Sequence, residues 1–378
     1  MSSATLDTRQ HPTADQASQW RLMWWAFRRH KLAVTGLIIV FLLYFIAAFA
    51  EVIAPYDPDL SNARAINHPP QGLHLIKTGP DGGWRFQPHV TAMAQKRDPM
   101  TLATTFAPDP TRTVDIEIFG KGAPVTMWGL FTVERRLIAP KVPGERFYLI
   151  GADRLGRDML SRIIYGTRIS MSIGLIGVAM SLVLGILLGG LSGYYGGWVD
   201  ATVQRIVEFK LSMPTIPIWL GLSAALPQDW PPTWRYFAIT VILSLIGWTE
   251  LARVVRGRFL ALRTEDFVVA ARLDGCSQMR VIFRHMLPSM VSHIIASVSL
   301  AIPMMIIAET SLSFLGLGLL PPTISWGVLL KEAQNVRTIA EAPWLFSPGV
   351  AVCIAVLALN FLGDGMRDAA DPYAQEGR

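Results

Sequence analysis

Few residues of this chain could carry catalytic chemistry, and they form no familiar catalytic motif. The 378 residues contain no Gly-x-x-x-x-Gly-Lys-Ser/Thr phosphate loop, no His-Glu-x-x-His metal site and no Gly-x-Ser-x-Gly nucleophile turn. His285 and His293 are eight residues apart, and packing or helix-end positions explain them better than a metal pair. We therefore expect no catalytic residue, metal or cofactor on this chain, and no ATP hydrolysis by the phosphate-loop route.

Two glutamates are the ionisable residues that most need an explanation. Glu250 and Glu309 stand near the ends of long apolar runs, where an ionisable group suggests a function by default. For Glu250, the simpler interpretation is a position at the membrane interface or a pair with Arg253. For Glu309, a functional role and a structural role fit the sequence equally well. An intramembrane enzyme would need paired catalytic groups at one depth, and only isolated glutamates are present.

The elements that hold these residues follow from composition. Hydrophobic residues make up 51% of the chain, charged residues only 16%, and the mean hydropathy is +0.37. Soluble domains carry about 25% charged residues, so a water-soluble enzyme, a disordered chain and a fibre are all disfavoured. The apolar residues gather in runs close to the ~20 residues with which a helix crosses the hydrocarbon core. Six transmembrane helices are predicted, at about 32–53, 168–191, 205–226, 235–252, 288–310 and 345–364.

The first apolar run has an alternative interpretation as a cleaved signal sequence. Ala48-Phe49-Ala50 resembles a small-x-small cleavage site. However, the run has 19 uncharged residues and follows 31 others, whereas a signal sequence has an apolar region of about 7–15 residues after a short basic start. We therefore expect the run to remain as a membrane anchor.

Positive charge indicates the orientation. The segment between the fourth and fifth predicted spans contains seven arginines and three acidic residues, and loops rich in Lys and Arg stay in the cytoplasm. Residues 1–31 and the tail 367–378 then also lie in the cytoplasm, while 54–167 form a long outer loop. In that loop, Thr113–Ile118 alternates as a half-buried strand does, and Met127–Val133 is a second candidate strand. The net charge of +6 is thus an orientation signal, with no nucleic-acid partner expected.

The cytoplasmic segment 253–287 has the strongest local pattern. Thr264 is expected to cap a helix that runs through Phe267–Leu273 and stops at Gly275. Ser277 is expected to cap a second helix, Gln278–Met286, which Pro288 limits. Two short helices around a Gly turn could read DNA, but a loop tethered to the membrane at both ends makes a protein-docking surface, or a plain solvated loop, the better interpretation.

Four motifs in this chain resemble those of one transporter family. Ala270-Ala271-x3-Gly275-x11-Leu287-Pro288 resembles the EAA loop of ABC-importer membrane subunits. The other three are similar to signatures of the oligopeptide/dipeptide permease family, and their order resembles that of the second, C-type permease of the pair. They are Gly151–Arg162, Ser311–Gly318 with Pro321-Pro322-x3-Trp326-Gly327, and Asn360–Pro372.

The resemblance implies an all-α integral membrane protein with six transmembrane helices, the type I ABC-importer permease fold and a long, partly β outer loop. The core would be 168–366, with five spans and the coupling loop 253–287. The chain would form half of a pathway for peptides or similar small solutes in the bacterial inner (plasma) membrane. Its implied partners are a second permease, two ATPase subunits that hold ATP and Mg, and an extracytoplasmic substrate-binding protein.

Site residues carry over motif by motif. Coupling to the ATPases through 264–283 would involve Asp266, Val269, Ala270, Ala271, Arg272, Asp274, Gly275, Leu287 and Pro288. The family-signature residues are Gly151, Asp153, Gly156, Arg157, Asp158, Glu309, Ser313, Gly316, Gly318, Gly363, Asp364, Arg367, Asp368, Asp371 and Pro372.

The chain departs from the family pattern in two places. Val269 occupies the position of the glutamate in the EAA motif, which puts a direct acidic contact there in doubt, although Glu265 and Asp266 lie one turn earlier. The outer loop is longer than in typical dipeptide permeases. The alternative function is a self-sufficient secondary transporter or channel, which would predict deep ionisable residues in several spans or inverted repeats. The solute is not determined by these residues.

Overall fold

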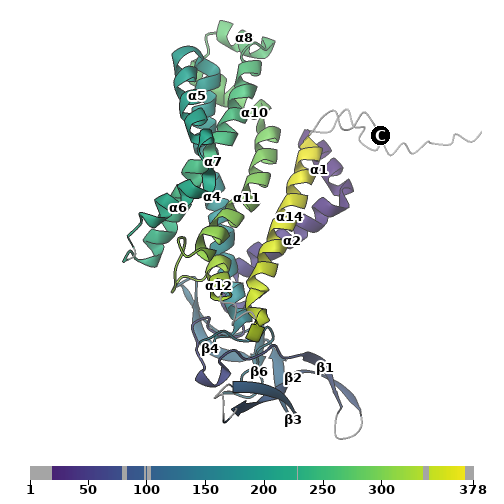
Figure 1. Ribbon diagram of the computed structural model, residues 1–378. Coiled ribbons are helices and arrows are strands. Elements are labelled where there is room, and N and C mark those ends of the chain that lie inside the picture. The colour runs from purple at the N-terminus through teal and green to yellow at the C-terminus, as the bar shows by residue number, and fades with distance from the viewer. Residues whose placement is uncertain are drawn as a thin grey trace, which may run out of the picture.

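The computed structural model describes residues 19–78, 83–97, 99, 104–227, 229–334 and 340–370. Long helices form most of it, a β-rich lobe lies at one end, and the short helix α8 lies at the other (Figure 1). In the described residues, five helices are long and apolar enough to cross a membrane. They are α2 (Lys31–Ala48), α4 (Met159–Tyr195), α7 (Pro232–Leu262), α11 (Val291–Phe314) and α14 (Ser347–Ala370).

The third predicted span, 205–226, is not one continuous helix. It is divided between α5 (Gly197–Ser212) and the short apolar α6 (Thr215–Ala224). Pro214 lies at the break and Met213 before it is extended, because a residue preceding proline is pushed out of the helical region. The described part of the chain therefore has five helices of spanning length, whereas the sequence predicts six.

Two other spans are longer than predicted because arginines lie inside the helices. The sequence boundary was placed at Arg168, yet α4 begins nine residues earlier. Arg168 pairs with Glu51, with 2.6 Å between Nη2 and Oε2. α7 runs ten residues past the predicted end at 252 and contains Arg256, which pairs with Asp200 of α5, with 2.6 Å between Nη2 and Oδ2. Paired arginines need not end a helix, so charge alone misplaced both boundaries.

A face of small residues brings α4 and α7 together. Gly185, Gly189 and Gly193 repeat every four residues and face α7. A Cβ on Gly189 or Gly193 would collide with α7, and a Cβ on Gly185 would lie 3.0 Å from the Leu251 side chain. At Gly193, for example, it would lie 2.7 Å from the Arg256 carbonyl oxygen. This small-xxx-small spacing forms a helix contact, and α7 packs closely on α4.

In the described residues, the β-rich lobe is built from six strands, partly as predicted. A four-stranded antiparallel sheet has the order β1-β2-β3-β6, and β4-β5 form a separate hairpin. The predicted strand 113–118 lies within β3, whereas 127–133 is not one strand: it contains the last residue of β4, the turn 128–130 and the first three residues of β5. The bounds are β1 Leu73–Thr78, β2 Trp84–Arg97, β3 Thr104–Ile118, β4 Lys121–Met127, β5 Phe131–Arg135 and β6 Ile138–Pro140.

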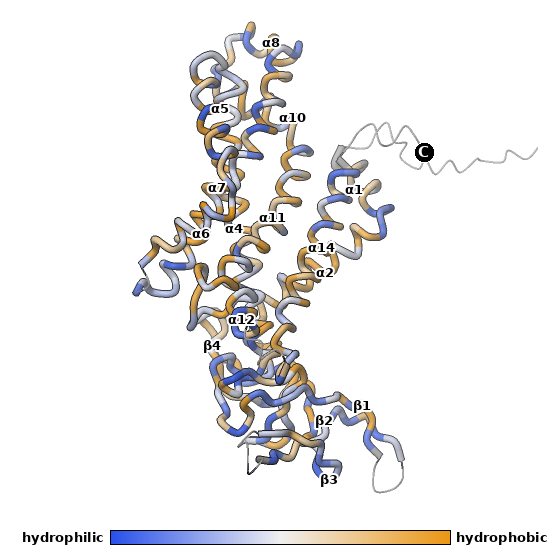
Figure 2. The backbone as a smooth tube through the Cα atoms, in the orientation of Figure 1, coloured by the Kyte–Doolittle hydropathy of each residue, from blue (hydrophilic) through white to orange (hydrophobic). Residues whose placement is uncertain are grey.

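Short helices complete the ends of the bundle. Figure 2 shows apolar stretches along the middle of the long helices and more polar residues at both ends. α1 and the last turns of α14 lie together, with Gly365 against Ala33 of α2. The short helices are α1 Gln19–Arg29, α3 Ala50–Ile53, α8 Asp266–Leu273, α9 Gln278–Arg280, α10 Leu287–Ser289 and α12 Trp326–Glu332.

Candidate functional site

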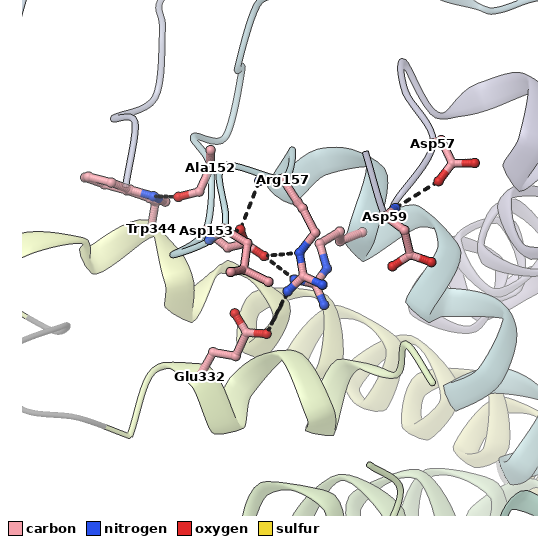
Figure 3. A network of polar contacts seen from close by, with 9 residues as sticks. Asp57, Asp59, Ala152, Asp153, Arg157, Glu332 and Trp344 are labelled. Atoms are coloured by element: carbon pink, nitrogen blue, oxygen red, sulfur yellow. Dashed lines mark hydrogen bonds and ion pairs between the residues drawn. The ribbon is translucent and has the colours of Figure 1, made fainter. Parts of the chain in front are cut away.

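A buried ion-pair network surrounds Asp153, at the end of α4 nearest the β lobe. The Asp153 side chain is 0% exposed, and its Oδ2 accepts from Arg157 Nε at 2.7 Å and from Arg162. Both arginines also reach Glu332 of α12, at 3.2 Å and 3.4 Å (Figure 3). Asp153 Oδ1 accepts the Leu155 and Arg157 backbone N–H groups. The signature segment therefore joins α4 to α12, and Glu332 is the member that sequence reasoning missed.

The two signature glycines permit this close packing. Gly151 and Gly156 have φ of +87° and +69°, a region that residues with a Cβ rarely adopt. A Cβ on Gly151 would lie 2.6 Å from the Trp344 ring, whose Nε1 donates to the Ala152 carbonyl at 2.9 Å. A Cβ on Gly156 would collide with the Asn62 backbone.

Asp158 starts α4. Its Oδ2 accepts the Ser161 backbone N–H at 2.8 Å and the Ser161 hydroxyl at 2.7 Å. Full burial raises the pKa of Asp158 to about 6, against the opposing effect of those hydrogen bonds. The residue is thus the N-cap of the helix, a structural role for a signature position.

Glu309 is the centre of a second buried network. Its carboxylate accepts the hydroxyls of Ser313 and Ser325 at 2.8 Å each and that of Ser170 at 3.3 Å. Within the described residues, no lysine or arginine pairs with it. The Glu309 side chain is fully buried within the protein.

The hydroxyls around Glu309 also bind backbone. The Ser170 hydroxyl oxygen accepts a hydrogen bond from the Trp326 backbone N–H at 3.1 Å. In the same way, the Ser325 hydroxyl accepts from the Val328 N–H at 3.2 Å, and the Ser313 hydroxyl accepts from the Leu319 N–H at 3.0 Å. Glu309 therefore links α4, α11, α12 and the loop between α11 and α12. The remaining signature glycines fit this loop closely: Gly318 lies against Ser313, and Gly316 has a φ of +80°.

Segment 253–287 contains the predicted first helix with a different cap. α8 begins after Glu265, and the Thr264 hydroxyl donates to the Ala261 carbonyl instead. Gly275 has a φ of +74°, and the Cys276 N–H bonds to the Ala271 carbonyl, a Schellman-type end. The predicted second helix is interrupted: α9 passes into a π-helical stretch, Val281–Met286, and then α10, which contains Pro288.

Ala271 does not lie on the surface that the sequence suggested. It is 7% exposed and packs in the chain's own core with Val268, Val281 and Met286. Leu287 packs against the same cluster, and Arg272 lies over the Tyr194 ring, 4.9 Å from its centre.

The opposite side of this segment is exposed and partly apolar. Its members are Asp266, Phe267, Val269, Ala270, Leu273, Asp274, Met279 and Phe283, with Leu273 83% exposed. We call these eight residues the α8 surface. Val269 therefore supplies apolar contact area at the position where the EAA motif has its glutamate.

A cavity of about 610 Å³ lies among α5, α6, α7 and α11. Its lining is mostly apolar, but it includes Lys210 and Glu250. Within the described residues neither side chain forms a hydrogen bond or ion pair, so the expected pairing of Glu250 with Arg253 is wrong. Trp219 also lines the cavity, and its buried Nε1 has no hydrogen-bond acceptor among the described residues.

The C-terminal signature divides between core and surface. Gly363 packs against Leu300 and Ser299 of α11. Asp364, Arg367 and Asp368 are exposed and line a hollow beside His30. Asp371 and Pro372 lie outside the described residues.

Two further ion pairs had no local sequence signal, because each joins residues that are far apart in the chain. Arg168 binds Glu51, as described above, and also the Ala47 and Ala48 carbonyls. Arg256 of α7 binds Asp200 of α5, with 2.6 Å between Nη2 and Oδ2.

Comparison with known proteins adds an independent line of observation. Residues 159–375 match the family described as binding-protein-dependent transport system inner membrane component, and 18–70 match the N-terminal transmembrane domain of oligopeptide transport permease C. The glutathione transport system permease protein GsiD of Pectobacterium atrosepticum is 40% identical over 223 residues, 59% of this chain and 72% of that protein. The oligopeptide transport system permease protein OppC of Bacillus subtilis is 28% identical over 356 residues, 94% and 90% of the two chains.

Among solved structures, an inward-facing form of the MetNI methionine ABC transporter is 17% identical and covers 56% of this chain and 98% of its own, with a TM-score of 0.45.

Proposed function

The chain belongs to the family of binding-protein-dependent transport system inner membrane components and is a permease subunit of an ABC importer, and we propose that it forms one half of the translocation pathway for peptides or similar small solutes. A second permease completes the pathway, two ATPase subunits bind ATP and Mg below it, and a substrate-binding protein delivers solute from outside. The chain itself is not an enzyme. This assignment needs six membrane crossings, with α5 and α6 together making the third.

The observation that carries this proposal is the α8 surface. It lies at the end of the molecule opposite the β lobe (Figure 1) and exposes apolar side chains on a segment held in place by its own core. A rigid element with exposed apolar groups is what a coupling helix requires, because ATP binding can favour one membrane conformation only through contacts that differ between the two states. Segment 264–283 and both chain termini then lie in the cytoplasm.

Substitutions on the two sides of α8 test the coupling role. Leu273→Glu adds a charge to the exposed side, so we expect loss of co-purification of the ATPase subunits while the melting temperature of the permease stays unchanged. Ala271→Glu adds a charge to the buried side, so we expect lower yield and a lower melting temperature. Leu75→Glu, on exposed β1, is the control and should leave assembly intact. Full ATPase assembly with Leu273→Glu would contradict the docking role.

We further propose that the cavity lined by Lys210 and Glu250 is part of the solute pathway. One positive and one negative side chain on an apolar wall suit a solute with an ammonium and a carboxylate, such as a peptide with free ends. Lys210→Gln and Glu250→Gln should each reduce peptide uptake into proteoliposomes at least severalfold, while ATPase assembly remains. Unchanged uptake in both variants would exclude the cavity from the pathway, and uptake by this chain without any ATPase would favour a secondary transporter.

A further inference from the structure

We propose that the tip of the β4–β5 hairpin inserts into the outer lipid–water interface and anchors the β lobe to the bilayer. The tip is Trp128–Phe131. The geometry that supports this proposal is the contact between this tip and the outer end of α2.

The tip is fastened to the end of a membrane helix. Trp128 Nε1 donates to the Ala48 carbonyl at 2.8 Å, at the last residue of α2. The Trp128 and Phe49 rings are 5.8 Å apart, and Phe49 lies 4.7 Å from Phe45 on α2. An aromatic row therefore leads from the exposed surface of the helix to the hairpin.

Charged residues at this end of α2 mark where its apolar stretch stops. Arg168 binds the Ala47 carbonyl and Glu51 there. Because α2 is uncharged between Lys31 and this point, its outer end lies where hydrocarbon gives way to headgroups. Tryptophan is enriched at that depth, since its ring is apolar and its N–H needs a polar partner.

The tip itself has the composition of a membrane-inserting loop. Residues 126–133 are uncharged, and Trp128, Leu130 and Phe131 are each more than half exposed. Trp128 and Gly129 have φ of +53° and +73°, a tight reversal that projects the side chains outward. The hairpin's ion pair, Lys121 with Glu134, lies several residues away from the tip.

Lipid is a better environment for the tip Trp128–Phe131 than water or the surface of another protein. A protein partner would need a surface fitted to the tip, whereas the tip's apolar surface is continuous with Phe45 and with the exposed apolar side chains of α2, which face lipid in a membrane helix. Insertion would fix the distance of the whole lobe from the membrane, so that the long outer loop is held in place at this tip as well as by its chain connections.

Spin labels at matched sites test the proposal. With Cys276 and Cys353 replaced by serine, a nitroxide is attached at Leu130→Cys in the full-length chain. The labelled chain is reconstituted, with the subunits that co-purify with it, into phosphatidylethanolamine/phosphatidylglycerol vesicles. Collision with oxygen, which concentrates in lipid, is compared with collision with a water-soluble nickel chelate. Ile38→Cys on α2 is the lipid control, and Leu75→Cys on β1 is the water control; both sites are exposed.

We expect the oxygen-to-nickel collision ratio at Leu130 to exceed the ratio at Leu75 severalfold and to approach the ratio at Ile38. A ratio equal to that at Leu75 would show a tip in water, and protection from both reagents would show a tip covered by protein. Either result would overturn the proposal. Labelled variants are compared only if they keep the melting temperature of the unlabelled chain.

Discussion

Replacing Asp153 should loosen the junction between α4 and α12 more than replacing any surface charge does. In Asp153→Ala, Arg162 would remain almost fully buried, at 2% exposure, without its main carboxylate, and two backbone N–H groups would lose their acceptor. Removing one partner of a buried ion pair costs about 3–5 kcal/mol. At about 1.4 kcal/mol per tenfold, local opening should increase roughly a hundredfold to a few thousandfold.

Hydrogen–deuterium exchange of the assembled complex measures this effect directly. Peptides covering 151–162 and 326–334 should lose protection, because Asp153 holds Arg157 and Arg162, which in turn hold Glu332 of α12. Glu208→Ala is the matched control, since its pair with Arg205 is exposed on α5, and exposed pairs contribute about 0.2–1 kcal/mol.

A double substitution separates charge burial from packing. In Asp153→Leu with Arg162→Met, both buried charges become apolar, and such replacements are often neutral. Because Arg157 can still pair with Glu332, the double variant should recover much of the protection lost by Asp153→Ala. Exchange in Asp153→Ala within threefold of the unaltered chain, or a double variant worse than the single one, would refute the reasoning.

Three further predictions concern single positions. Gly189→Val should prevent α4 from approaching α7 and abolish the yield of folded chain from detergent extraction, whereas Gly221→Ala, with open space around it, should not. Glu309→Leu should leave three serine hydroxyls without their acceptor and lower the melting temperature by several degrees, while Glu309→Gln, which keeps an acceptor oxygen, should retain most of the stability. Burial raises the pKa of Asp158 from 3.8 to about 6, so its stabilising contribution is complete below pH 3.8 and is lost as the pH rises through 6. The melting temperature of the unaltered chain should therefore fall across that pH interval, and that of Asp158→Asn should fall less steeply. Equal slopes of melting temperature against pH in the two chains would contradict the burial argument.

Local sequence rules worked wherever neighbours in the chain decide the outcome. The stop at Gly275 follows from an αL position that glycine fills best, and the contact face Gly185–Gly193 follows from helical spacing. The same rules failed where remote residues decide. Charge alone predicts a span boundary at Arg168, because its partner Glu51 lies more than a hundred residues earlier in the chain. The local pattern places Ala271 on the surface, because nothing nearby in the sequence shows that it faces Val281 and Met286.

The signature motifs could be recognised in the sequence, but their roles could not be assigned. Asp153 and Glu309 stand in similar signatures, yet one holds two arginines and the other three serine hydroxyls. Glu332 and Ser325 complete these networks from positions without a distinctive pattern. The role of a buried charged group depends on the protein groups that hydrogen-bond to it in place of water. Those groups come together only when the chain packs.

Apolar run length, charge placement and motif order are properties of the chain alone, and they are enough to place it in a membrane, to locate its arginine-rich loop and to indicate its family. The fold was needed to show that span three breaks at Pro214, that α8 turns Leu273 outward and Ala271 inward, and that Lys210 and Glu250 line one cavity. Those outcomes depend on which side chains exclude water from one another, and that is settled by contacts between residues remote in sequence.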